Sequence, residues 1–253
     1  MANAPLSHSA LWPATLAVVL LQHGINLLND VKDWQLGADT LKFDSWVRIH
    51  GERLDITSLH GWLSLLSGGL LGLLTLLAHQ RLWILSFTLP LVLLGILYNS
   101  GKKPLSYSAA GEWATAICYG PGVFGGLWFT AAQPLNGTLL LGMLAFAAFA
   151  TALLFSHQPP QIETDRRAGK RSFAVRHGAE ATYRASMLLL VISLGALSLA
   201  FCLFGEKISA ACFSLGFLAA CSWIYKLTPN PRRIMVSTAL VFLLTALGAV
   251  LEY

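Results

Sequence analysis

The chain has 253 residues, of which 55% are hydrophobic and 11% are charged. Soluble domains carry about a quarter charged residues, and one aqueous fold of this length could not bury so much apolar surface. The composition therefore predicts an integral membrane protein and excludes an ordinary soluble domain. The net charge of +5 does not indicate nucleic-acid binding, because its distribution along the chain has another explanation.

Apolar runs close to the length of about 20 residues that a helix needs to cross a bilayer recur along the chain. Turn-forming residues separate them, among them Asn99-Ser100-Gly101, Pro159-Pro160 and Pro229-Asn230-Pro231. The sequence predicts an all-α, polytopic membrane helix bundle that forms a single domain over residues 1–253. The eight predicted spans are 9–29, 58–79, 82–98, 109–131, 136–156, 183–204, 208–226 and 233–251.

The basic residues alternate between the loops that join these spans. The odd-numbered loops carry 15 of the 17 Lys and Arg residues, and the even-numbered loops carry only Arg81 and Lys207. Basic loops stay on the cytoplasmic side, so the alternation supports eight spans with both termini outside the cytoplasm. Because ten of the twelve acids also lie in or beside the odd loops, we expect a cytoplasmic functional surface on a bacterial inner-membrane protein.

The first run ends in acids and amides, so we expect a retained helix and not a cleaved signal peptide. Asn26, Asp30 and Asp33 share one helical face, Asn29 lies four residues before Asp33, and Asp39 follows. Clustered carboxylates repel one another and are costly beside lipid, and a divalent cation would relieve both costs. Mg²⁺ suits this set because it uses one or two carboxylates together with water and phosphate oxygens. The alternative is a solvated helix end with a capping aspartate.

The fifth loop holds a second polar segment, in which acids precede a basic cluster. Glu163 and Asp165 could serve a second Mg²⁺, and Lys170 and Arg176 could hold phosphate oxygens. Gln161, just before the acids, could ligate through its carbonyl oxygen but supplies no charge. The alternative is topological, since membrane insertion alone requires a basic loop on the cytoplasmic side.

The third loop begins with Tyr98 and Lys102, and Glu112 follows them. A tyrosine and a lysine at the mouth of a bundle could hold a phosphate group or an aromatic substrate, although lysines in a loop are otherwise ordinary. His23 and His60 also lie near the cytoplasmic ends of their helices, and we interpret both as structural polar groups.

Acid clusters on two helices with a Tyr-x-x-x-Lys segment between them resemble the UbiA superfamily of intramembrane prenyltransferases. Asn29-Asp30-x-x-Asp33-x-x-x-x-x-Asp39 is similar to the first motif of its 1,4-dihydroxy-2-naphthoate polyprenyltransferases, which implies a metal role for these four residues. The resemblance covers about residues 20–180. It implies Mg²⁺-dependent transfer of a prenyl group from a polyprenyl diphosphate to an aromatic quinone precursor in the bilayer.

The two other motifs carry the rest of the implied site. Tyr98-x-x-x-Lys102 is similar to the middle motif of the family, and residues 163–176 are similar to its second acidic motif and basic tail. The second motif implies a metal role for Glu163 and Asp165. The diphosphate-binding residues implied are Tyr98, Lys102, Lys170 and Arg176, and the catalytic residues implied are Asp30, Asp33, Lys102 and Asp165.

Two departures from the family pattern accompany the resemblance. Gln161 stands where the family usually has the first Asp of its second motif. The family has nine helices, whereas the first acidic motif here closes the first span, which predicts a UbiA-like bundle without the first of the nine. A UbiA-type terpene cyclase and a diverged non-catalytic homologue stay open as alternatives. A transporter is disfavoured, since its polar residues should lie near mid-membrane. The acceptor, the prenyl chain length and the oligomeric state are left open.

Overall fold

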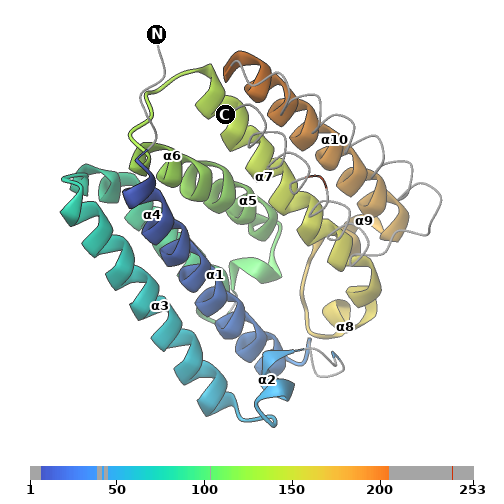
Figure 1. Ribbon diagram of the computed structural model, residues 1–253. Helices are drawn as coiled ribbons and strands as arrows, with labels where there is room; N and C mark the ends of the chain where they lie inside the picture. The colour runs from blue at the N-terminus through green and yellow to red at the C-terminus, as the bar shows by residue number, and fades with distance from the viewer. Residues whose placement is uncertain (1–6, 39–41, 43–44, 103, 205–240, 242–253) are drawn as a thin grey trace.

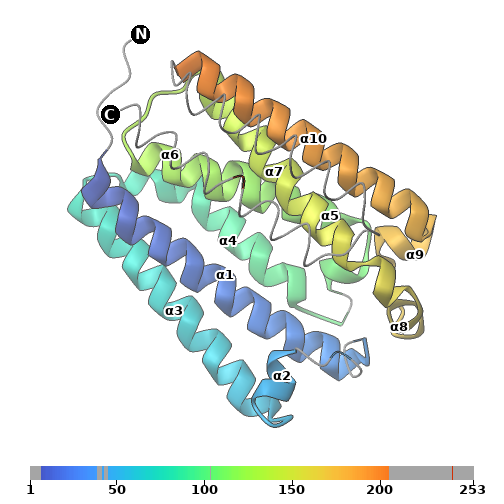
Figure 2. The same cartoon turned by 45° about the vertical axis from the view of Figure 1, so that its right-hand side comes forward.

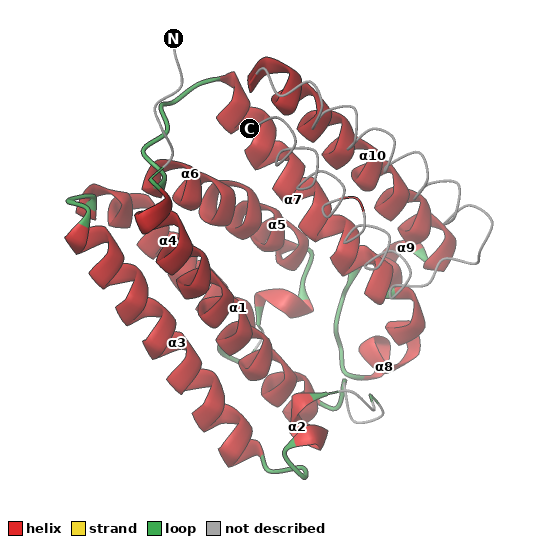
Figure 3. Cartoon of the chain, viewed as in Figure 1, coloured by secondary structure: helices red, strands yellow, loops and turns green. Residues whose placement is uncertain are grey.

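The computed structural model describes residues 7–38, 42, 45–102, 104–204 and 241. This part of the chain is built of helices and turns and contains no strand, as Figures 1 and 3 show, so the expected all-α class is confirmed. The long helices are α1 (His8–Leu36), α3 (Leu54–Ala78), α4 (Leu85–Asn99), α7 (Gly137–His157) and α10 (Ala179–Phe204).

Five helical stretches within the described residues are long and apolar enough to cross a membrane, as expected of an integral membrane protein. They are His8–Leu36, Leu54–Ala78, Leu82–Asn99, Gly137–Arg167 and Ala179–Leu203. Each overlaps one of the predicted spans. The predicted spans 208–226 and 233–251 lie outside the described residues.

The predicted span 109–131 forms as three joined helical pieces. They are α5 (Ala110–Ile117), a π-helical segment (Cys118–Gly125) and α6 (Gly126–Thr130). Pro121 lies inside the π-helical segment, where it removes one backbone donor and crowds the preceding turn. Gly120 packs there against α7, since an added Cβ atom would lie 2.6 Å from the Met143 carbonyl oxygen.

Successive long helices run in opposite directions, so the first, third and fifth loops lie at one end of the bundle (Figures 1 and 2). The short helices α2 (Trp46–Ile49), α8 (Ile162–Arg167) and α9 (Phe173–His177) lie at that end. These loops carry most of the basic residues, so their convergence agrees with the predicted alternation.

The contact between α1 and α3 is built on glycines. A Cβ atom added at Gly24 would lie 2.7 Å from the Gly61 carbonyl oxygen, and one added at Gly68 would lie 2.8 Å from the Ala17 carbonyl oxygen. Small residues let membrane helices approach closely enough for their backbones to pack. This packing fixes α1, the helix that carries the first acidic cluster, against α3.

We expect Gly24→Val to lower the melting temperature in detergent, because the added side chain would meet backbone atoms of α3 that cannot turn aside. Overpacking of this kind typically costs about 1–3 kcal/mol of folding free energy. Circular dichroism during heating measures the change. Gly69→Val on α3 is the matched control, because a Cβ atom there meets nothing within 4 Å. Equal melting temperatures for the two variants would show that the glycine contact does not matter.

Candidate active site

The acidic end of α1 meets the fifth loop through one lysine. Lys170 Nζ lies 3.0 Å from Asp33 Oδ2 and 4.0 Å from Asp165 Oδ1, and both aspartates are only 2% exposed. Burial alone would disfavour the charged form of Lys170, but the two carboxylates outweigh that effect and raise its pKa above the ordinary value. Asp33, Lys170 and Asp165 therefore form a buried charged cluster, which we call the acid–lysine cluster.

Two oxygen atoms beside the acid–lysine cluster lack hydrogen-bond donors. Asn29 Nδ2 donates to Asp33 Oδ2 at 3.1 Å, which fixes the two side chains against each other. Asn29 Oδ1 and Asp33 Oδ1 are buried, and no group in the described part of the chain donates to them. A buried acceptor without a donor costs about 1–3 kcal/mol, so a bound cation would be stabilising at this position.

The residues present fit a magnesium ion that is shared with a substrate. Among the residues that the structure describes, no three His, Cys, Asp or Glu side chains converge to enclose an ion by themselves. Mg²⁺ does not need such a cage, because it typically takes one or two carboxylates and completes its shell with water and substrate phosphate oxygens. The free oxygens of Asn29 and Asp33 are hard ligands of that kind.

Asp165 is held in place by residues that the sequence analysis did not single out. Ser172 Oγ donates to Asp165 Oδ2 at 2.9 Å, and the Lys170 amide donates to the Asp165 carbonyl oxygen at 2.8 Å. Gln158 Oε1 accepts from the Ala174 amide at 3.2 Å and so anchors the start of α9. The sequence gives only a weak indication of these roles, since a serine and a glutamine beside a polar loop are common.

The third loop joins the same cluster. The Arg171 amide donates to the Tyr107 carbonyl oxygen at 3.1 Å, and Lys170 Nζ stands 5.3 Å from the centroid of the Tyr107 ring. Tyr98 lies within electrostatic reach of Lys170 and Asp33. The end of α1, the third loop and the fifth loop thus meet at Lys170.

The chain matches the family described as the UbiA prenyltransferase family over residues 1–244. It belongs to this family. The resemblance drawn from the three motifs is thereby confirmed.

Several relatives are prenyltransferases that are named for naphthoate or naphthoquinone compounds. The 1,4-dihydroxy-2-naphthoate octaprenyltransferase of Mycobacterium tuberculosis is 30% identical over 192 residues, or 74% of this chain and 65% of that protein. The 2-carboxy-1,4-naphthoquinone phytyltransferase of Synechocystis is 28% identical over 166 residues, or 65% of this chain and 53% of that protein. The chain thus spans about half to two thirds of the length of the curated relatives it matches. No solved structure matches it.

Asp30, an expected metal ligand from the first UbiA motif, forms its contacts with the first loop instead. Its Oδ2 accepts from the Trp46 amide at 2.7 Å, and its Oδ1 pairs with Lys42 Nζ at 3.2 Å. Trp46 begins α2, so Asp30 fastens this short helix to α1. The carboxylate is buried, but Trp46 and Lys42 belong to the first loop and not to the acid–lysine cluster.

Glu163, an expected ligand of the second UbiA motif, is not brought to Asp165. Its side chain is 61% exposed and pairs with Arg166 at 3.4 Å and Arg167 at 3.2 Å. These arginines follow it on α8 at helical spacing, so the local pairs hold the carboxylate on the outer face of the helix. Asp165, by contrast, is buried.

Of the other expected positions, those that the structure describes do not belong to the acid–lysine cluster. Lys102 is exposed, and no described residue pairs with it. Asn26 is exposed and accepts from Gln22 at 3.0 Å. Gln161 caps α8 with a half-buried side chain. Asp39 lies outside the described residues.

Arg176, expected to hold diphosphate, pairs with an acid that the UbiA motifs did not assign. Its Nη2 lies 3.1 Å from Glu112 Oε1, and its Nε donates to the Arg171 carbonyl oxygen at 3.1 Å. The pair joins α9 to α5 and brings a further buried carboxylate to this end of the bundle. The sequence shows Glu112 just after the middle motif, but its partner lies far along the chain.

His23 and His60 form a chain with His50 at the junction of α1, α2 and α3. The Nε2 atoms of His23 and His60 are 3.4 Å apart, and His60 Nδ1 lies 3.4 Å from His50 Nε2. His50 Nδ1 in turn lies 3.0 Å from the Thr57 hydroxyl. The rings also pack against Trp46, which agrees with the structural role expected for them.

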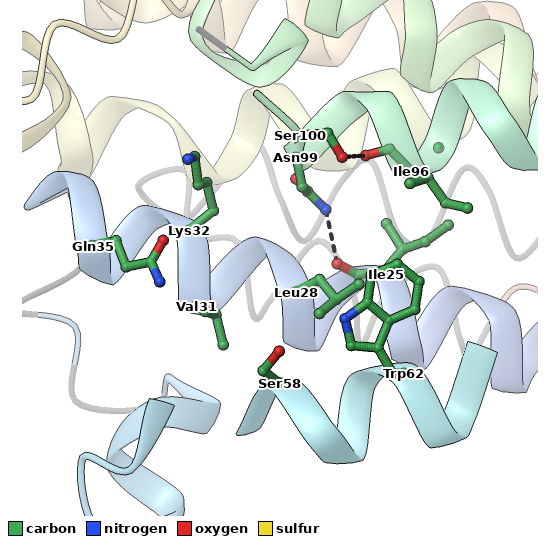
Figure 4. A pocket seen from close by; sticks show the side chains of 11 residues that line it. Ile25, Leu28, Val31, Lys32, Gln35, Ser58, Trp62, Ile96, Asn99 and Ser100 are labelled. Carbon is green, nitrogen blue, oxygen red and sulfur yellow. Dashed lines mark hydrogen bonds between the residues drawn. The ribbon is translucent and has the colours of Figure 1, made fainter. Parts of the chain in front are cut away.

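A separate pocket opens between α1, α3 and α4 and is lined by Ile25, Leu28, Lys32, Trp62 and Asn99, among others (Figure 4). Asn99 Nδ2 donates to the Ile25 carbonyl oxygen at 3.0 Å across its floor. No member of the acid–lysine cluster lines this pocket. The candidate active site is therefore the acid–lysine cluster and its surroundings.

Proposed function

We propose that this chain transfers a prenyl group from a prenyl diphosphate to an aromatic acceptor, with Mg²⁺ as cofactor. This proposal rests on the buried acid–lysine cluster, in which Asp33 at the end of α1 meets Asp165 and Lys170 of the fifth loop beside two unpartnered oxygen atoms. The names of the relatives support a 1,4-dihydroxy-2-naphthoate-like quinone precursor as the acceptor. The basic loops that build the site support a cytoplasmic orientation at a bacterial inner membrane.

The chemistry requires an allylic carbon–oxygen bond to break as diphosphate leaves. Mg²⁺, when bound, supplies positive charge for the developing negative charge on the diphosphate oxygens. Asn29 and Asp33 offer oxygen ligands, and Lys170 places a second positive charge beside them. Asp165, oriented by Ser172, holds Lys170 from the other side.

Water must be excluded, because the cation-like carbon would otherwise be hydrolysed. The aspartates of the acid–lysine cluster are almost fully buried, and the Lys170 side chain is only 15% exposed. The long apolar helices can accept a prenyl tail, while the charged head stays at the loop end of the bundle. The acceptor ring then attacks the allylic carbon from the protected interior.

We propose residue roles that combine the motifs with this geometry. Asp30 is proposed as a positioning residue, because it holds α2 through Trp46. Asp165 is proposed as the only metal-site acid of the second motif, since Glu163 pairs with two arginines. Tyr98, Lys102 and Arg176 are kept as proposed diphosphate contacts, and Asp39 as a supporting metal ligand, from the motif alone.

The test is a product assay with purified protein in detergent, Mg²⁺ and labelled prenyl diphosphates of several lengths. We expect a prenylated naphthol, identified by mass, only when 1,4-dihydroxy-2-naphthoate and a donor are both present, and none after chelation of Mg²⁺. A new hydrocarbon with diphosphate release and no acceptor would identify a terpene cyclase instead. Absence of turnover with every donor would favour the non-catalytic homologue.

A further inference from the structure

We propose that Glu112 binds a hydroxyl group of the aromatic acceptor and takes its proton during prenyl transfer. This inference rests on the proposed prenyl-transfer function and adds to it the position of the acceptor. The aromatic substrates that fit are those with a free ring hydroxyl.

The two carboxylate oxygens of Glu112 have different surroundings. Oε1 lies 3.1 Å from Arg176 Nη2, whereas Oε2 is buried and receives no hydrogen bond from any residue that the structure describes. The whole residue is 9% exposed, so water reaches it poorly. Oε1 thus forms the ion pair with Arg176, and Oε2 can still accept a hydrogen bond from a donor.

A buried, charged oxygen without a donor is costly. The loss of a hydrogen-bond donor at such an atom costs about 1–3 kcal/mol, and more when the group is charged. Ionisable groups within a membrane bundle that carry this cost mark functional sites by default. A hydroxyl group of a bound substrate would supply the missing donor.

A second polar atom, on the segment that packs against the start of α5, also lacks a partner. Ser106 Oγ is buried, and no described residue forms a hydrogen bond with it. Gly111 lets this segment pack directly on α5, since an added Cβ atom would lie 3.0 Å from the Leu105 carbonyl oxygen and 3.1 Å from Ser106 Cα. Two unpartnered groups on touching segments fit a ligand with more than one polar substituent.

Glu112 lies beside the acid–lysine cluster and not within it. Its partner Arg176 donates to the carbonyl oxygen of Arg171, the residue after Lys170. Lys170 Nζ in turn stands 5.3 Å from the ring centroid of Tyr107, which follows Ser106. An acceptor held at Glu112 would therefore lie next to a diphosphate held at Lys170, as the bond-forming step requires.

The proposed step is balanced as follows. The hydroxyl proton of the acceptor passes to Glu112 Oε2, and the electron pair left on that oxygen flows into the ring. A ring carbon forms a bond to the first carbon of the prenyl group. The bond from that carbon to the diphosphate oxygen breaks, and its electron pair leaves with diphosphate. The ring carbon then loses its other substituent, as a proton or as carbon dioxide from a carboxylate, and the electron pair of that bond restores the aromatic ring. Glu112 returns the proton to the ring oxygen. General-base assistance of this kind is worth typically about 10²–10⁴-fold in rate.

The test compares the wild-type chain with Glu112→Gln, which keeps the shape of the side chain and removes the base. We expect kcat for prenyl transfer to fall about 100-fold or more at neutral pH. Activity of the variant should recover as the pH rises, because the acceptor hydroxyl then ionises in solution. Binding of an unreactive prenyl thiolodiphosphate, measured by calorimetry, should not weaken, because Asp33, Lys170 and Arg176 all remain and Arg176 loses only a competing carboxylate.

Glu180→Gln is the matched control, because this glutamate is 80% exposed and pairs only with Arg184 among the residues described. Ser106→Ala is a second variant that keeps the carboxylate, and we expect it to raise the KM for the acceptor severalfold without changing thiolodiphosphate binding. Wild-type kcat in Glu112→Gln at every pH would overturn the assignment while leaving the proposed function intact. A wild-type chain that prenylates no hydroxylated aromatic compound would overturn both.

Discussion

Asp33→Asn is expected to lower the rate of prenyl transfer by at least about 100-fold, the scale on which a single preorganised electrostatic contact acts in catalysis. The substitution keeps the size of the side chain but removes the charge that faces Lys170 at 3.0 Å. It also weakens a metal ligand, because the Oδ1 atom of Asp33 is one of the two unpartnered oxygens. Steady-state turnover in detergent, with product identified by mass, measures the loss.

The control for this prediction is Asp55→Asn. Asp55 is 69% exposed at the start of α3 and pairs with Arg53, outside the acid–lysine cluster. We expect this control to retain normal turnover. Circular dichroism should show both variants to be folded, so that the lost activity reports on the site. Normal turnover in Asp33→Asn would mean that the cluster does not carry the reaction.

Lys170→Met is expected to destabilise the protein and to make its stability depend on Mg²⁺. The variant leaves Asp33 and Asp165 buried without their shared positive charge. Removing one partner of a buried ion pair typically costs about 3–5 kcal/mol. A bound divalent cation restores a positive charge between the carboxylates, so Mg²⁺ should raise the melting temperature of the variant more than that of the wild type.

Thermal unfolding with and without Mg²⁺ measures this effect, and Arg167→Met serves as the control. Arg167 is 73% exposed, so its loss should leave the melting temperature almost unchanged. The double variant Asp33→Asn/Lys170→Met should be less destabilised than the sum of the single variants, because the two residues are in contact. Additive losses, or a melting temperature in Lys170→Met that equals the wild type, would show that the pair is not coupled.

Most of the fold could be predicted because lipid imposes a simple rule. A span must be long, apolar and helical, so hydropathy alone located the five stretches that the structure confirms. The alternation of basic loops predicted which loops share one end of the bundle. The segment around Pro121 was predicted as one span, but its π-helical geometry depends on packing against Met143 that hydropathy does not show.

The motifs indicated which residues could form the candidate site, but they did not indicate which partners those residues contact. Asp33 and Asp165 meet at Lys170, as an acidic pair with a basic tail would suggest. Asp30 and Glu163 also match the motif spacing, yet neither reaches Lys170. Asp30 accepts a hydrogen bond from a backbone amide, and Glu163 pairs with two arginines. Helical periodicity tells which residues share a face, but it does not tell which neighbour that face meets.

Glu112 illustrates the opposite case. In the sequence it is a lone acid at the start of an apolar run, and such a residue is often only solvated at a helix end. Its role depends on Arg176 in another loop and on the close packing that Gly111 allows. These contacts are tertiary, so no local sequence pattern predicts them.

The most direct test of the account is whether a metal ion and a prenyl diphosphate bind together at the acid–lysine cluster. Mn²⁺ accepts the same oxygen ligands as Mg²⁺ and can be followed by electron paramagnetic resonance. We predict that unreactive prenyl thiolodiphosphate tightens Mn²⁺ binding in the wild type, and that Asp33→Asn abolishes this tightening while Asp55→Asn preserves it. Equal Mn²⁺ binding by wild type and Asp33→Asn, with or without the diphosphate, would contradict the placement of the active site.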